Sequence, residues 1–251
     1  APEIEIMVVP DIETQAILYE NGQVDLMLTG NQLKSASTDS VLLLDLQPHR
    51  STKLSYFAYS SDNPPFNEWE VRAALSHSVD MSAIVGSVYG NMTSWAEGLI
   101  GKGVPCHQRE IGYKFNPQLA RILLSKSSYV SGNNLPEISL GVSGLEESLV
   151  AEMAVQQWME NIDTRVTIER VGSRAVEPDV IRIRRAEINP PILDPGHLLS
   201  QIGASDSEWA RTTTKHSNGN LDRLVKLANK TNIYDPDRCL LYNAVENEIL
   251  D

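Results

Sequence analysis

Residues 64–90 constrain the fold most, because their pattern predicts two short helices that meet at a capped corner. Pro64 and Pro65 hold the backbone extended and prevent a helix from starting earlier. Asn67 is a favourable N-cap, and Glu70 lies three residues on, where its carboxylate can reach back to the cap amide. The apolar stripe of this first helix consists of Val71, Ala74, Leu75 and Val79.

The second helix of this segment is predicted to begin after Asp80, whose side chain is a suitable N-cap, and to end at Gly90. Its apolar positions are Ile84, Val85 and Val88. The whole segment, PPFNEWEVRAALSHSVDMSAIVGSVYG, closely resembles the signature PPFND-x-RVRQALSYAIDR-x-AI-x-x-x-x-YGG of family 5 extracellular solute-binding proteins. These proteins are the peptide- and nickel-type receptors of ABC importers, and the signature is long and specific.

Strand-like and helix-like segments alternate along the rest of the chain, which indicates mixed α/β layers. Strands are predicted at 3–9, 24–28, 41–46, 54–59, 135–142, 165–171 and 180–183. Further helices are predicted at 11–20, from Asn116 onward, and at 146–161, 220–229 and 236–250, with irregular segments at 31–40 and 189–196. Several of these segments also resemble family 5 phrases, in the order that the family has them.

The resemblance implies an α/β, periplasmic-binding-protein-like fold of class II, with two lobes around a cleft. Residues 1–65 would form part of the first lobe and residues 66–251 most of the second lobe. The sequence shows no signal peptide, lipobox or transmembrane run, and it begins and ends within regular patterns. We therefore expect it to belong to a longer protein. Because a cleft needs both walls, we expect the chain alone to bind solute weakly or not at all.

Composition argues against nucleic acid and anionic membrane as partners. The chain has 21 Lys and Arg residues against 33 Asp and Glu residues, which gives a formal net charge of -12. Arg182, Arg184 and Arg185 form a local basic cluster. In so acidic a chain we expect these arginines to pair with nearby acids, of which the candidates are Glu177, Asp179 and Glu187.

Signals of catalysis are weak. Ser143-Gly144 follows a predicted strand and is typical of a turn, since the glycine spacing of a nucleophile elbow is absent. Cys106 and His107 are adjacent and do not face each other as a Cys–His dyad requires. Cys106 and Cys239 are far apart in the sequence and have no histidines at ligand spacing, so they do not indicate a zinc site; they can form one disulfide or stay free, and we favour two free buried thiols. We expect no enzyme activity, metal or cofactor.

The candidate ligand-binding residues follow from the resemblance. Peptide-binding members of the family carry a W-x-A-D-Y stretch whose acidic side chain meets the α-amino group of the ligand. The matching residues here are Arg184-Arg185-Ala186-Glu187-Ile188, so Glu187 takes the acidic position, while Arg184 and Ile188 replace the two aromatic residues. Arg184 could instead attract a carboxylate or phosphate, and a solvated Arg–Glu pair is the alternative without a ligand. Tyr59 and Ser60 are further candidates, in a strand that lacks the family's asparagine.

The resemblance thus implies the substrate-binding component of an ABC importer, a monomer that binds a small solute, with a peptide as the favoured class, and delivers it to an inner-membrane permease. Its location would be the periplasm or the cell surface. One alternative is the ligand-sensing domain of a cytoplasmic transcriptional regulator that shares the fold. A hydrolase that uses Ser143 or Cys106 is a third hypothesis, which would require that changing either residue abolishes activity.

Overall fold

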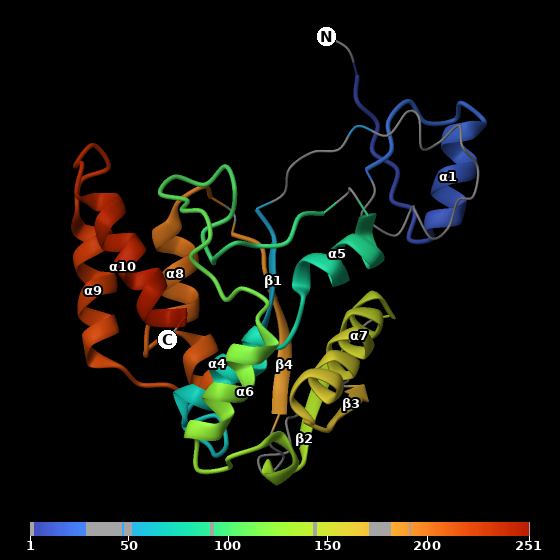
Figure 1. Ribbon diagram of the computed structural model, residues 1–251. Helices are drawn as coiled ribbons and strands as arrows, with labels where there is room; N and C mark the ends of the chain where they lie inside the picture. Colours follow the sequence, from blue (N-terminus) through green and yellow to red (C-terminus); the bar gives the residue numbers. More distant parts are fainter. Residues whose placement is uncertain are drawn as a thin grey trace. The chain divides into compact units, whose positions relative to one another are not determined.

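The computed structural model describes residues 3–28, 47, 52–90, 93–142, 145–170, 182–190 and 192–250 (Figure 1). The chain divides into two compact units, residues 1–50 and 51–251. The boundary expected from the resemblance, after residue 65, lies further along the chain than this division. Assignment of the two parts to lobes stays a prediction.

The first unit contains helix α1, Ile12–Glu20, as the sequence predicts. Asp11 is its N-cap, and the carboxylate accepts a hydrogen bond from the backbone N–H of Thr14 at 2.7 Å. The helix ends at Asn21, after which Gly22 adopts a φ of +67°, a conformation that suits glycine. Ala16 forms the small core of this unit, packed against Ile12, Tyr19 and Met27.

The strands predicted at 3–9 and 24–28 are absent from the described part of the first unit, so these two predictions are wrong for this structure. Ile4, Ile6 and Val8 are 82–86% exposed, and Leu26 and Leu28 are also exposed. A strand is stabilised only when its backbone pairs with another strand, and the described residues of this unit supply none. The loop predicted at 31–40 and the strand predicted at 41–46 lie outside the described residues.

The second unit is built on a four-stranded sheet with the order β1-β4-β2-β3. Its strands are β1 (Leu54–Ala58), β2 (Ile138–Val142), β3 (Val166–Arg170) and β4 (Arg182–Ile188). Strand β1 is antiparallel to β4, whereas β2 is parallel to both β4 and β3. All four were predicted, although β4 continues five residues beyond the predicted end at residue 183, to Ile188.

The two signature helices are α4, Trp69–His77, and α5, Met81–Tyr89. Asp80 caps α5 by accepting a 3.0 Å hydrogen bond from the N–H of Ala83, and Gly90 ends it with a φ of 60°, as predicted. The N-cap of α4 is Glu68 rather than Asn67, and its carboxylate accepts hydrogen bonds from Ser128 instead of capping the helix. The predicted apolar stripe of α4 is buried.

Helices α6 (Pro117–Lys126) and α7 (Leu145–Ile162) complete the core on one face of the sheet, with α4 and α5. A short 3₁₀ helix, Gly132–Asn134, joins α6 to β2. Trp158 of α7 is fully buried in this core, and its indole N–H donates to the carbonyl of Leu75 at 2.9 Å. The side chain therefore ties α7 to α4 through both packing and a hydrogen bond.

The other face is covered by helices α8 (Pro195–Gly203), α9 (Gly219–Lys230) and α10 (Arg238–Leu250), whose apolar residues form a second core. A π-helical turn, Ala210–Thr214, lies between α8 and α9. Helix α8 was not predicted, and α10 starts two residues later than the expected 236–250, because residues 235–238 form a turn. Among the described helices, none has the length and apolar character needed to cross a membrane.

Cys106 and Cys239 form a disulfide, which corrects the expectation of two free thiols. Their Cα atoms are 4.9 Å apart, although 133 positions separate the two cysteines in the sequence. The bond joins the loop that follows α5 to the first turn of α10. The sequence spacing left this pairing open because only the packing of α10 brings the two residues together.

Candidate functional site

In the second unit, the helices that follow the neighbouring strands β2 and β4 pack on opposite faces of the sheet. After β2 the chain enters α7, which packs on the face that carries Phe57 and Ile183. After β4 it enters α8, which packs on the face that carries Leu54 and Tyr56. Figure 1 shows α7 and α8 on opposite sides of the β1–β4 pair. In open α/β sheets, the carboxyl ends of two such neighbouring strands form a crevice where ligands bind.

The register of β4 decides which predicted site residues lie together. Ser55 is opposite Glu187, Phe57 is opposite Arg185 and Ala58 is opposite Arg184. Because side chains alternate along a strand, Arg185 and Glu187 share one face of the sheet, near the carboxyl end of β4. Arg184 lies on the opposite face, so the structure separates it from the other two predicted residues of this strand.

Glu187 forms an ion pair with Lys53, whose Nζ lies 2.7 Å from the Oε2 atom of Glu187. The side chains are 39% exposed at Glu187 and 49% exposed at Lys53. Sequence reasoning missed Lys53, since it lies far from Glu187 along the chain. The predicted strand at 54–59 indicated that Lys53 lies at the start of a strand. To place Lys53 beside Glu187, one would also have needed to know that this strand pairs with β4 and in which register.

Arg185 is held more firmly than Lys53 or Glu187. Its Nη1 forms an ion pair with Oε1 of Glu147 in the first turns of α7, and its Nη2 donates to Oγ of Ser55 at 3.3 Å. The side chains of Arg185 and Glu147 are only 10% and 20% exposed. Arg185 therefore links β4 to β1 and α7, and we assign it to positioning these elements around Glu187.

Tyr59 and Ser60 lie at the other end of the β1–β4 pair, since β1 runs antiparallel to β4. The Tyr59 ring packs against Phe66 with centroids 5.2 Å apart, and its hydroxyl lies 3.4 Å from Oγ of Ser76. Burial raises the pKa of Tyr59 to about 12. The hydroxyl of Ser60 accepts a 3.1 Å hydrogen bond from Asn63. The structure therefore places these two predicted residues in the turn before α4 and does not bring them to Glu187.

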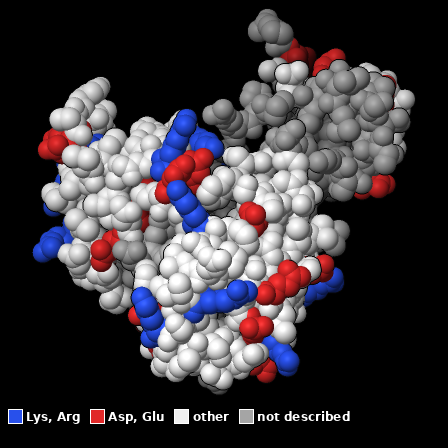
Figure 2. Space-filling view, viewed as in Figure 1, with Lys and Arg blue, Asp and Glu red and all other residues white. Residues whose placement is uncertain are grey.

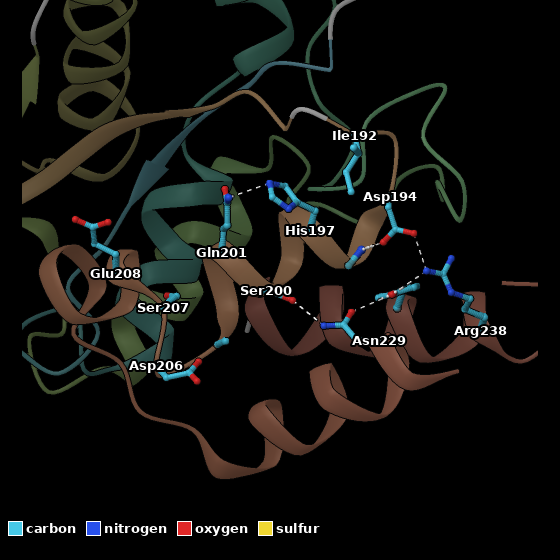
Figure 3. A pocket seen from close by; sticks show the side chains of 13 residues that line it. Ile192, Asp194, His197, Ser200, Gln201, Asp206, Ser207, Glu208, Asn229 and Arg238 are labelled. Carbon is cyan, nitrogen blue, oxygen red and sulfur yellow. Dashed lines mark hydrogen bonds and ion pairs between the residues drawn. The ribbon is translucent and has the colours of Figure 1, made fainter. Parts of the chain in front are cut away.

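A second polar cluster fixes the segment that follows β4 (Figure 3). Asp194 caps α8 by accepting a 2.8 Å hydrogen bond from the N–H of Gly196, and it also accepts from Arg238 at 2.6 Å. The Arg238 guanidinium lies 4.8 Å from the ring centroid of Tyr242 and donates to the Tyr242 hydroxyl. That hydroxyl in turn donates to Asn229 of α9 at 3.0 Å. The network joins α8, α9 and α10 at the start of α8.

This cluster borders an open hollow of about 640 Å³. The residues that line it are Ile192, Asp194, Gly196, His197, Ser200, Gln201, Ala204, Asp206, Ser207, Glu208, Asn229, Arg238 and Tyr242. Figure 3 shows Asp194 and Arg238 directed toward each other across one end of it. Since its central charged groups are already paired, we interpret this cluster as structural.

The structure gives little support to a catalytic role or a metal site. Cys106 is bonded to Cys239, so it carries no thiol that could act as a nucleophile. Ser143 lies outside the described residues. Within the described ranges, His, Cys, Asp and Glu side chains form no group of three or more that could ligate a metal ion. On the face drawn in Figure 2, basic side chains lie among acidic ones rather than forming a continuous basic surface.

Comparison with known proteins defines the class to which this fold belongs. The family model of Bacterial extracellular solute-binding proteins, family 5 Middle, matches residues 1–194, and the chain belongs to this family. The family consists of solute-binding proteins rather than enzymes. The resemblance on which the sequence prediction rested is thus confirmed.

Curated proteins similar in sequence support the family assignment. The chain is 24% identical to Heme-binding protein A of Haemophilus influenzae over 95% of this chain and 46% of that protein. It is 26% identical to Di/tripeptide-binding protein 3 of Pseudomonas aeruginosa over 94% of this chain and 45% of that protein. Glutathione-binding protein GsiB of Escherichia coli is 23% identical over 96% of this chain and 49% of its own length. The chain therefore spans about half the length of the curated relatives it matches.

Solved structures confirm the fold. The substrate-binding protein CtaP of an ABC transporter from Listeria monocytogenes matches with a TM-score of 0.80 at 17% identity, over 97% of this chain and 50% of that chain. A dipeptide-binding protein from Pseudoalteromonas, solved with Met-Leu, matches with a TM-score of 0.73 at 20% identity, over 97% and 49% of the two chains. The predicted α/β fold of the periplasmic-binding-protein class is thus shown.

Proposed function

We propose that this chain is part of the substrate-binding component of an ABC importer, which captures a small solute of the peptide class outside the cytoplasm and delivers it to a membrane permease. The family assignment supports solute binding. The relatives named for peptides and glutathione support a solute of the peptide class. The disulfide supports an oxidising, extracytoplasmic location and weighs against a cytoplasmic regulator.

Within this proposal, Glu187 receives the terminal ammonium group of the solute. The observation that supports this assignment is the 2.7 Å ion pair of Glu187 with Lys53, in which the carboxylate pairs with an ammonium group at the carboxyl end of β4. A charge-assisted hydrogen bond of this kind fixes the orientation of a bound peptide as well as adding affinity. Arg185 and Glu147 hold the strand and α7 in place around it.

The proposed mechanism is closure of two lobes around the solute, without any change in its covalent bonds. Only one wall of the cleft would come from residues 66–251. For that reason we propose that affinity resides in the complete protein, and that this chain by itself binds weakly.

Titration calorimetry on the complete protein tests the proposal. The panel contains dipeptides, tripeptides, their N-acetylated forms, glutathione and hemin. We expect free-amine peptides to bind, and E187Q to weaken that binding about ten- to a hundred-fold, the range for loss of a hydrogen bond to a charged group. E152Q, which changes an exposed glutamate on α7, is the matched control. Equal affinity of wild type and E187Q, or no binding by any peptide, would refute the proposal.

A further inference from the structure

Lys53 is placed beside Glu187 by the sheet itself. Because Leu54 pairs with Ile188 and Ser55 with Glu187, Lys53 lies opposite Asn189 and diagonal to Glu187 on the same face. Diagonal neighbours on antiparallel strands lie within reach of long side chains. The 2.7 Å contact therefore follows from the register of the two strands.

We propose that Lys53 is a specificity-determining residue, because in the solute-free protein its ammonium group occupies the position on Glu187 that the ammonium group of the solute would take. The inference rests on the proposed role of Glu187. A solute with a free terminal amine displaces Lys53 and replaces its ion pair. A solute whose amine is blocked carries no charge with which to do so.

The ion pair between Lys53 and Glu187 is weak enough for a solute to displace Lys53. Both side chains are partly exposed, and ion pairs between exposed side chains contribute little free energy. The neighbouring cation, Arg185, does not meet this condition, since Glu147 and Ser55 hold it in a largely buried position. Lys53 is thus the basic side chain for which the structure shows a contact with Glu187.

Removing the competitor should tighten binding of free-amine solutes. Exposed ion pairs are worth about 0.2–1 kcal/mol, so K53M should raise the affinity for a free-amine dipeptide by about 1.4- to 5-fold. The affinity for an N-acetylated dipeptide should stay the same, because that solute does not exchange with Lys53. K114M is the matched control, since Lys114 forms a comparable exposed ion pair with Glu110 at 2.6 Å.

One arm of the test needs no solute. Amine labelling followed by peptide mapping measures the modification rates of Lys53 and Lys114 in wild type and in E187Q. We expect E187Q to accelerate labelling of Lys53 and to leave Lys114 unchanged. An unchanged rate at Lys53 would overturn the inference, because the ion pair would then not restrain this side chain in solution.

The second arm is calorimetry of the complete protein with alanyl-phenylalanine and its N-acetylated form, in wild type, K53M, K114M and E187Q. Tighter binding of the free-amine peptide by K53M alone supports the inference. If wild type binds this peptide in a Glu187-dependent way but K53M binds it equally or more weakly, the inference fails and the proposed function stands. If no variant binds it, or if binding is independent of Glu187, both fail together.

Discussion

The disulfide between Cys106 and Cys239 should contribute much of the stability of residues 51–251. The cross-link closes a loop with a sequence separation of 133, and in the chain-entropy treatment a loop of that length restricts the unfolded state by about 5 kcal/mol. Measured losses in other proteins are typically 2–5 kcal/mol. We therefore expect the C106A/C239A double variant to lose about 2–5 kcal/mol of unfolding free energy.

Urea unfolding followed by circular dichroism measures this loss, in the oxidised protein, the reduced protein and the double variant. Both cysteines are partly exposed, so a mild thiol reductant should reach the bond. Reduced wild type should then unfold at nearly the same urea concentration as the double variant. Equal midpoints for the oxidised protein and the double variant would show that the disulfide does not stabilise the fold, and free thiols in the native, oxidised protein would show that it does not form.

Three further predictions concern buried groups. Glu246 accepts hydrogen bonds from two backbone N–H groups of the loop before Cys106. Burial raises the pKa of its carboxyl group. The stability that the protonated form provides is therefore present below pH 4.5 and is lost as pH rises through the raised pKa. E246Q should remove this pH dependence in urea unfolding, and an unchanged dependence would contradict the assignment. W158F should cost about 0.5–1.5 kcal/mol for the lost hydrogen bond, because the carbonyl of Leu75 loses the indole N–H but keeps the hydroxyl of Ser78 as a donor; an unchanged unfolding midpoint would argue against this. G196A should also destabilise, since a Cβ atom there would lie 2.3 Å from Oδ1 of Asn229; calorimetric melting that shows no loss would exclude this crowding.

Local signals in the sequence were sufficient to predict most of the helices and strands. Asp11, Asp80 and Asn116 each cap a helix that was predicted to start there, because N-cap signals depend on residues within one turn. Asn67 is an exception, since Glu68 takes the N-cap position of α4. Helix α8 was missed because its turn-like start at Asp194-Pro195 and its small residues resemble a loop. Its stability comes from packing on α9 and α10 and from the Arg238 network.

Long-range relations were the part that sequence patterns could not provide. The strand predicted at 3–9 has the alternation of a strand and the strand predicted at 24–28 is largely apolar, but neither pairs with a strand among the described residues of the first unit. Glu187 was identified by resemblance, whereas its contact with Lys53 depends on the register between β1 and β4. The same register places Arg184 on the other face of the sheet. The disulfide likewise depends on how α10 packs.

A crystal structure of the complete protein with a bound free-amine peptide would show directly whether Glu187 receives the ammonium group of the solute. We expect the terminal ammonium of the peptide to lie within hydrogen-bond distance of the Glu187 carboxylate, outside the carboxyl ends of β2 and β4, with Lys53 displaced. A peptide bound elsewhere, with the Lys53–Glu187 ion pair intact, would contradict it.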